Sequence, residues 1–77
     1  MSTASSPLAT VELSGKIATL TLRRPEARNA LSLELLKDLE ACLDEILAAH
    51  AAKDARVLIL TGEGKSFCAG LDLKAIM

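Results

Sequence analysis

The sequence of 77 residues has little net charge, only two cysteines and no long hydrophobic run. A formal net charge of −1, with the two signs mixed along the chain, excludes the basic surface that binds nucleic acid. Two cysteines are too few for the disulfide framework of a small secreted domain, and they fit a reducing compartment. No apolar segment approaches the roughly 20 residues that cross a bilayer. We therefore expect a cytoplasmic protein that binds neither nucleic acid nor a membrane.

The sequence also has a single histidine, His50. No serine, cysteine or acidic residue has the spacing to it that a Ser-His-Asp or Cys-His catalytic group requires. We expect His50 to be structural, and we expect no metal site.

Residues 1–7 are rich in serine and threonine and contain no basic residue. They lack the charged start and the apolar middle of a secretory signal. We expect a disordered N-terminus here, followed by one small domain over residues 8–77.

Hydrophobic periodicity predicts the order β-β-α-β, followed by the start of another helix. Residues 8–13 and 17–22 alternate in polarity around a turn that contains Gly15, which is typical of a β-hairpin. Residues 57–60 form a short apolar run, which indicates a strand buried on both faces. Because a helix separates the second strand from the third, the pattern favours an α/β arrangement.

Ser32 is a good N-cap for the long helix, which no glycine or proline interrupts before residue 52. Apolar residues recur three and four positions apart and predict one buried face. Cys42 lies beside this face, and we expect it to be a small core residue. The face comprises Leu35, Leu36, Leu39, Leu43, Ile46 and Leu47, with His50 at its end.

Residues 57–74 read as strand, glycine-rich loop and helix start, with the helix beginning at Leu71. Backbone N–H groups at such a junction have no partner within the helix. The junction is therefore suited to an anion, or to a carbonyl oxygen that becomes one.

The segment F-C-A-G-L-D-L-K, residues 67–74, resembles the oxyanion loop of the crotonase superfamily, the enoyl-CoA hydratase/isomerase enzymes. The preceding V-L-I-L-T-G-E-G-K-S-F and the upstream T-L-R-R-P-E-A-R-N-A-L-S resemble the same family. The resemblance implies a crotonase-like spiral of repeated ββα units. Members of this family are much longer, so we expect only the N-terminal part of such a domain, a β-β-α-β-α start that is truncated at the C-terminus.

The resemblance implies that the backbone N–H of Leu71 stabilises the enolate oxygen of an acyl-CoA thioester. Gly70 would permit the close approach of that oxygen. Two positions depart from the family pattern. Many hydratases have alanine where Leu71 stands, and leucine there implies a different acyl pocket. Many have a basic residue where Glu26 stands, which makes Arg28 the expected cation for a coenzyme A phosphate. The implied coenzyme A contacts are Arg24, Ala27, Arg28, Ala69, Leu71, Asp72, Leu73 and Lys74.

The resemblance further implies that coenzyme A enters only as part of the substrate, with no separate cofactor. It also implies a homo-oligomer, a trimer or hexamer. The second oxyanion donor and the catalytic carboxylates of the family lie beyond residue 77. We therefore expect an enzyme of hydratase or isomerase type that needs the rest of its domain, and we do not expect the 77 residues alone to be competent.

Two alternatives stay open. Gly64, Lys65 and Ser66 look like the end of a nucleotide-binding P-loop, but that motif requires glycine where Ile59 stands. The chain can also be a non-catalytic, truncated interaction module that associates through its apolar faces.

Overall fold

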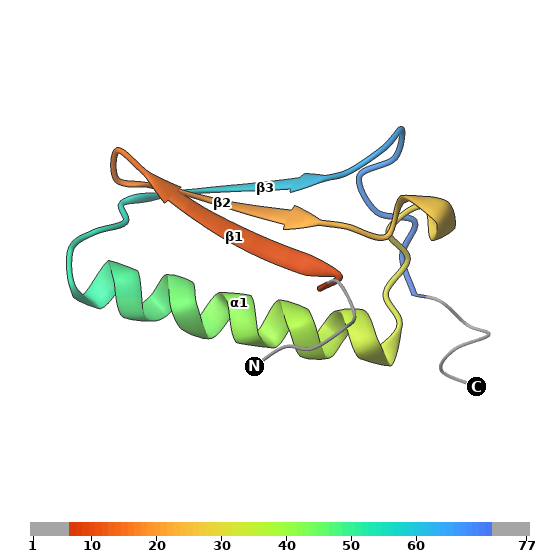
Figure 1. Cartoon of the computed structure of the whole chain (residues 1–77), viewed down its shortest axis with the longest axis horizontal. Coiled ribbons are helices and arrows are strands. Elements are labelled where there is room, and N and C mark those ends of the chain that lie inside the picture. Colours follow the sequence, from red (N-terminus) through yellow and green to blue (C-terminus); the bar gives the residue numbers. More distant parts are fainter. Residues whose placement is uncertain (1–6, 72–77) are drawn as a thin grey trace.

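The computed structural model describes residues 7–71 and shows a three-stranded sheet with one long helix along it (Figure 1). The elements are β1 (Ala9–Ser14), β2 (Ile17–Leu22), a short 3₁₀ helix η1 (Pro25–Ala27), α1 (Leu33–Ala51) and β3 (Val57–Gly62). The predicted order β-β-α-β is confirmed, and η1 was not predicted. A disordered terminus was predicted for residues 1–7 and a helix from Leu71 onward, and residues 1–6 and 72–77 of these two segments lie outside the described residues.

The strand order in the sheet is β1-β2-β3. β1 and β2 are antiparallel, with Ser14 opposite Ile17, so only two residues form the turn between them. Both turn residues, Gly15 at φ 58° and Lys16 at φ 72°, are left-handed, as tight hairpin turns require. β2 and β3 are parallel, and Leu22 lies opposite Gly62 where both strands end.

The core lies between α1 and one face of β1 and β2. Alternate residues of β2, namely Ala18, Leu20 and Leu22, are 0%, 1% and 3% exposed, as expected for a strand with one covered face. α1 contributes Leu35 and Cys42, seven residues apart and therefore on one side of the helix. Burial confirms the prediction for Cys42.

Burial also raises the pKa of the Cys42 thiol, and the nearby carboxylates of Glu45 and Asp38 raise it further. A raised pKa keeps the side chain in its neutral thiol form. Because the thiolate is the reactive form, Cys42 is a packing residue and not a nucleophile.

β3 is a strand, as predicted, but the prediction that it is buried on both faces is wrong for residues 7–71. The side chains from Val57 to Leu60 are between 45% and 53% exposed. Among the described residues, β3 lies at the edge of the sheet and pairs with β2 alone. The helix α1, which runs below β1 and β2 in Figure 1, does not cover it.

The predicted apolar face of α1 is also only partly buried within residues 7–71. Leu35 is buried and Leu39 and Ile46 pack against the core, whereas Leu43 and Leu47 are exposed. The apolar face is wider than the strip that two strands cover, so one side of it remains in contact with solvent. His50, at the C-terminal end, has Nδ1 3.1 Å from the Ala55 carbonyl oxygen, which supports its structural assignment. Within residues 7–71, no helix is both long and apolar enough to span a bilayer.

Ser32 caps α1 as predicted, and replacing it tests this element. Its Oγ accepts a hydrogen bond from the Leu35 N–H at 3.2 Å, and the side chain is 2% exposed. We expect Ser32→Ala to lower the free energy of unfolding by about 1–2 kcal/mol, because a buried N–H loses its acceptor. Urea unfolding measures this. The control Ser14→Ala changes an exposed residue and should alter stability by less than about 0.5 kcal/mol, and equal effects would contradict the capping role.

Candidate functional site

Two loops meet where β2 and β3 end. Parallel strands end at the same edge, so residues 23–31, after β2, and residues 63–71, after β3, leave the sheet side by side (Figure 1). These loops contain the sequence motifs that resemble the crotonase superfamily.

The first loop is organised by η1. The Arg28 N–H donates to the Pro25 carbonyl oxygen at 3.1 Å, and the Asn29 N–H donates to the Arg24 carbonyl oxygen at 2.8 Å. Arg28 at φ 54° and Asn29 at φ 56° are both left-handed, and asparagine tolerates this region better than most residues. The tight turn directs the Asn29 side chain toward the second loop.

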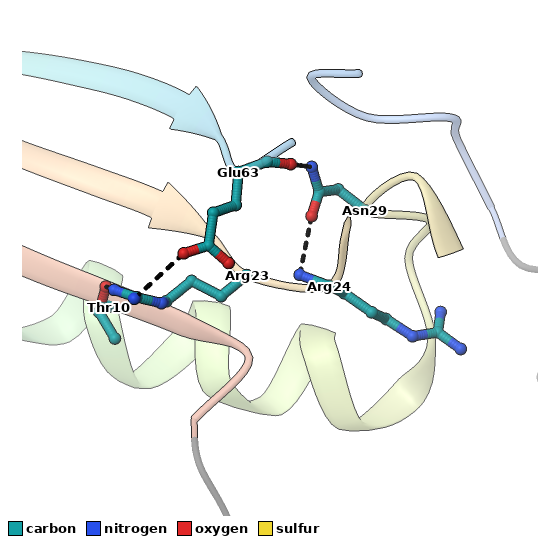
Figure 2. Close-up of polar contacts among 5 residues, drawn as sticks. All are labelled: Thr10, Arg23, Arg24, Asn29 and Glu63. Carbon is teal, nitrogen blue, oxygen red and sulfur yellow. Dashed lines mark hydrogen bonds and ion pairs between the residues drawn. The ribbon is translucent and has the colours of Figure 1, made fainter. Parts of the chain in front are cut away.

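Asn29 joins the two loops and is fully buried. Its Oδ1 accepts a hydrogen bond from the Arg24 N–H at 2.8 Å. Its Nδ2 donates to the carbonyl oxygens of Glu63 at 3.0 Å and Ser66 at 2.8 Å. Figure 2 shows the amide between Arg24 and Glu63. An asparagine in a loop commonly bonds to nearby backbone. The sequence therefore contains no signal for these distant partners.

Gly62, the last residue of β3, packs directly against this connection. A Cβ at Gly62 would overlap the Phe67 carbonyl oxygen and lie 2.7 Å from Nδ2 of Asn29. Glycine is therefore required here by space, because the second loop folds back over the end of the strand.

Backbone hydrogen bonds continue the contact between the loops. The Ala69 N–H donates to the Arg28 carbonyl oxygen at 2.9 Å, and the Leu31 N–H donates to the Gly70 carbonyl oxygen at 2.7 Å. Leu31 and Leu71 form an isolated parallel bridge. The prediction that a helix begins at Leu71 is therefore wrong for this residue, which is extended because it pairs with Leu31.

The pairing determines the direction of the Leu71 N–H. In this parallel bridge the Leu31 N–H bonds to the carbonyl oxygen of Gly70 and not to Leu71 itself, so the N–H of Leu71 points away from Leu31. Within residues 7–71, this N–H has no acceptor. Among these residues, no hydrogen bond competes with a ligand for the Leu71 N–H.

Gly70 has φ 98°, a conformation that residues with a Cβ rarely adopt. Apart from Gly70 itself and its two chain neighbours, no atom of residues 7–71 lies within 4 Å of a Cβ built on it. Within the described structure the backbone conformation, and not crowding, requires glycine at this position. The close approach of a substrate oxygen stays a prediction.

The predicted coenzyme A residues are partly brought together. Arg28 lies beside Ala69 through the backbone bond and has an exposed side chain. Nη1 of Arg24 donates to the Ala30 carbonyl oxygen at 2.9 Å, so its guanidinium supports the first loop. Ala27 lies in η1, half-buried. Asp72, Leu73 and Lys74 lie outside the described residues.

Arg23 belongs to the loop contact as well. Its Nη2 lies 3.1 Å from Oε2 of Glu63, and its Nη1 donates to Oγ1 of Thr10 at 3.3 Å (Figure 2). Both side chains of the ion pair are more than 40% exposed, so it contributes little to stability. The guanidinium of Arg23 is therefore bound by Glu63 and Thr10 of the same chain.

Other site types find no support. Residues 7–71 contain no group of three His, Cys, Asp or Glu side chains that can hold a metal ion. A P-loop continues from its Lys-Ser pair directly into a helix, whereas here the chain runs without helix from Ser66 to the bridge at Leu71. The geometry therefore argues against the nucleotide-binding alternative.

The crowding at Gly62 is testable. We expect Gly62→Ala to lower the free energy of unfolding by about 1–3 kcal/mol, because the methyl group displaces the Phe67 carbonyl and the Asn29 amide. Urea unfolding followed by circular dichroism measures the effect. Thr61→Ala, at the neighbouring exposed position, should cost less than about 1 kcal/mol. If the two substitutions destabilise the protein equally, the close packing is not real.

A family model described as enoyl-CoA hydratase/isomerase matches residues 12–77. Enoyl-CoA hydratase EchA19 of Mycobacterium tuberculosis is 45% identical over 71 residues, which are 92% of this chain and 26% of that protein. The (E)-benzylidenesuccinyl-CoA hydratase of Thauera aromatica is 48% identical over 67 residues, which are 84% of this chain and 25% of that protein. The chain thus spans about a quarter of the length of these curated relatives.

Solved structures agree with the sequence matches. A crystal structure of enoyl-CoA hydratase from Mycobacterium tuberculosis superposes with a TM-score of 0.81 at 38% identity, covering 92% of this chain and 27% of that one. The enoyl-CoA hydratase from Mycobacterium smegmatis gives a TM-score of 0.78 at 44% identity, covering 92% and 31%. The family model matches residues 12–77, and the fold of this chain agrees with that of these solved structures. The chain therefore belongs to the enoyl-CoA hydratase/isomerase family, the crotonase superfamily, as an N-terminal portion of that fold.

Proposed function

We propose that the polypeptide carrying this chain binds an acyl-CoA thioester and stabilises the negative charge that develops on its carbonyl oxygen. The donor is the backbone N–H of Leu71, next to Gly70. The observation that carries the proposal is that this N–H, at the meeting point of the two family motifs, has no acceptor within residues 7–71. The hydratase names of the relatives support the same substrate class.

The chemistry follows from where charge appears. Removing a proton beside a thioester carbonyl, or adding water to a conjugated double bond, places negative charge on the carbonyl oxygen. A fixed N–H that meets this oxygen stabilises the enolate more than the neutral ester, and so lowers the barrier. One such donor contributes on the order of 3 kcal/mol. We propose a reaction of hydratase or isomerase type, in line with the names of the relatives, and the family resemblance implies that its acid and base groups lie outside residues 1–77.

The coenzyme A portion is proposed to lie along the first loop. Arg28 is the cation best placed for it, because its side chain is exposed and its carbonyl holds Ala69. Ala27, Ala69, Asp72, Leu73 and Lys74 complete the proposed contacts, and Arg24 supports the loop from within. The active protein is proposed to be a homo-oligomer, as the family resemblance implies.

One observation favours a second candidate, a non-catalytic interaction module. The apolar residues of β3 and the outer apolar positions of α1 are exposed within residues 7–71, which is typical of surfaces that bind another protein segment. Binding of acyl-CoA distinguishes the two candidates.

Calorimetric titration of the intact protein with acetoacetyl-CoA tests the proposal. We expect saturable heat, and weaker binding of free coenzyme A, which lacks the carbonyl oxygen that meets the Leu71 N–H. Absence of heat at millimolar ligand would overturn the proposal and leave the interaction module as the better candidate.

Gly70→Val should abolish turnover of an enoyl-CoA substrate, a loss of at least about a hundredfold in kcat, because valine cannot adopt φ 98° and the Leu71 N–H moves. Far-UV circular dichroism should show the fold retained. Gly15→Val, at φ 58° in the hairpin turn, introduces comparable backbone strain far from the loop and should leave turnover within about threefold of the unmodified protein. Unchanged activity of the Gly70 variant would show that the oxyanion site lies elsewhere.

A further inference from the structure

We propose that Asn29 is a positioning residue, which holds the second loop so that the Leu71 N–H meets the thioester oxygen. The proposal rests on the function proposed above and assigns part of it to a side chain that does not touch substrate. Its basis is the set of contacts that the buried amide makes across 34 and 37 residues of sequence, to Glu63 and Ser66.

The hydrogen bonds fix the orientation of the Asn29 amide. Both hydrogens of Nδ2 are used by the carbonyl oxygens of Glu63 and Ser66, and Oδ1 accepts from the Arg24 N–H. The reversed amide would place an oxygen against two carbonyls and a donor against an N–H, so every contact would be lost. A fully buried amide with its donors and acceptor satisfied has one stable position.

Asparagine is the only side chain that fits this arrangement in size and in polarity. Aspartate has the same shape, but its carboxylate would face two carbonyl oxygens and can donate to neither. Alanine would leave the Arg24 N–H and the carbonyls of Glu63 and Ser66 without their partner. The pair of substitutions therefore separates loss of the amide from reversal of its polarity.

The connection from Asn29 to Leu71 is short. Within residues 7–71, three residues of the first loop hydrogen-bond to four residues of the second: Asn29 to Glu63 and Ser66, Arg28 to Ala69, and Leu31 to Gly70. The last two contacts are between backbone groups and survive any substitution at Asn29. Among these residues, two side chains of the first loop take part in the connection, the buried Asn29 and the exposed Arg23, whose ion pair with Glu63 contributes little. Without the Asn29 amide, the carbonyl oxygens of Glu63 and Ser66 lose their donor, and the start of the second loop is held less firmly.

Release of the loop start is expected to affect catalysis more than binding. Of the proposed coenzyme A contacts, Ala27 and the cation Arg28 are on the first loop, whose turn also has its own backbone bonds. Ala69, on the second loop, is held by the Arg28 carbonyl oxygen and not by the Asn29 side chain. The Leu71 N–H is on the second loop, and displacement of a catalytic group by about 1 Å can cost a hundredfold in rate. The role therefore predicts a lower kcat with little change in KM.

The test compares Asn29→Asp and Asn29→Ala with Ser32→Ala in the intact protein, at a temperature where all variants are folded. Ser32→Ala removes a buried hydrogen bond at the end of the same loop but none that reaches the second loop. We expect both Asn29 variants to lower kcat about 10- to 100-fold with KM within about threefold, and Ser32→Ala to leave kcat within about threefold at a similar loss of stability.

Acetoacetyl-CoA supplies a readout that stability alone does not move. Its enolate absorbs in the near ultraviolet, so the absorbance of the bound ligand reports how well the Leu71 N–H meets the oxygen. We expect saturated Asn29 variants to show less enolate than the unmodified protein and Ser32→Ala to show the same amount. Unmodified kcat and enolate absorbance in both Asn29 variants would overturn the positioning role while leaving the proposed function intact. Failure of the unmodified protein to bind the ligand would overturn both.

Discussion

Parallel pairing of β2 with β3 is the constraint on which the site depends. Two parallel strands end at the same edge of a sheet, so the loops that follow Leu22 and Gly62 must begin next to each other. A crossover helix is needed to bring the chain back for such pairing, and α1 provides it while covering the face of β1 and β2. The packing of α1 and the meeting of the loops are therefore two results of one topology.

The site is built mainly from backbone groups. The two loops are joined by main-chain hydrogen bonds, by the buried amide of Asn29 and by the exposed Arg23–Glu63 ion pair, and the proposed donor is itself a main-chain N–H. Glycine is required at position 62 by space and at position 70 by φ. The side chain of Leu71 is 60% exposed and takes no part in these main-chain bonds, so it can differ without altering the proposed donor.

The exposed apolar residues of β3 and α1 belong to the same topology. α1 covers β1 and β2, and its width leaves the edge strand and part of its own apolar face in contact with solvent within residues 7–71. The curated relatives are about four times as long as the matching segment. The core of this portion is accordingly small, and its stability rests on few side chains, among them Leu20 and Leu35.

The order of the elements, the hairpin turn, the cap at Ser32 and the family could be predicted from the amino-acid sequence, because each of these shows in residues that are close together in the chain. The exposure of β3 at the edge of the sheet, the extended backbone of Leu71 and the bonds of Asn29 to Glu63 and Ser66 became known from the fold. Those features depend on pairings between residues more than 30 positions apart, and local patterns contain no information on them. The roles of Gly70, Leu71 and the coenzyme A residues are likewise properties of the assembled site with its substrate, which is why they stay predictions.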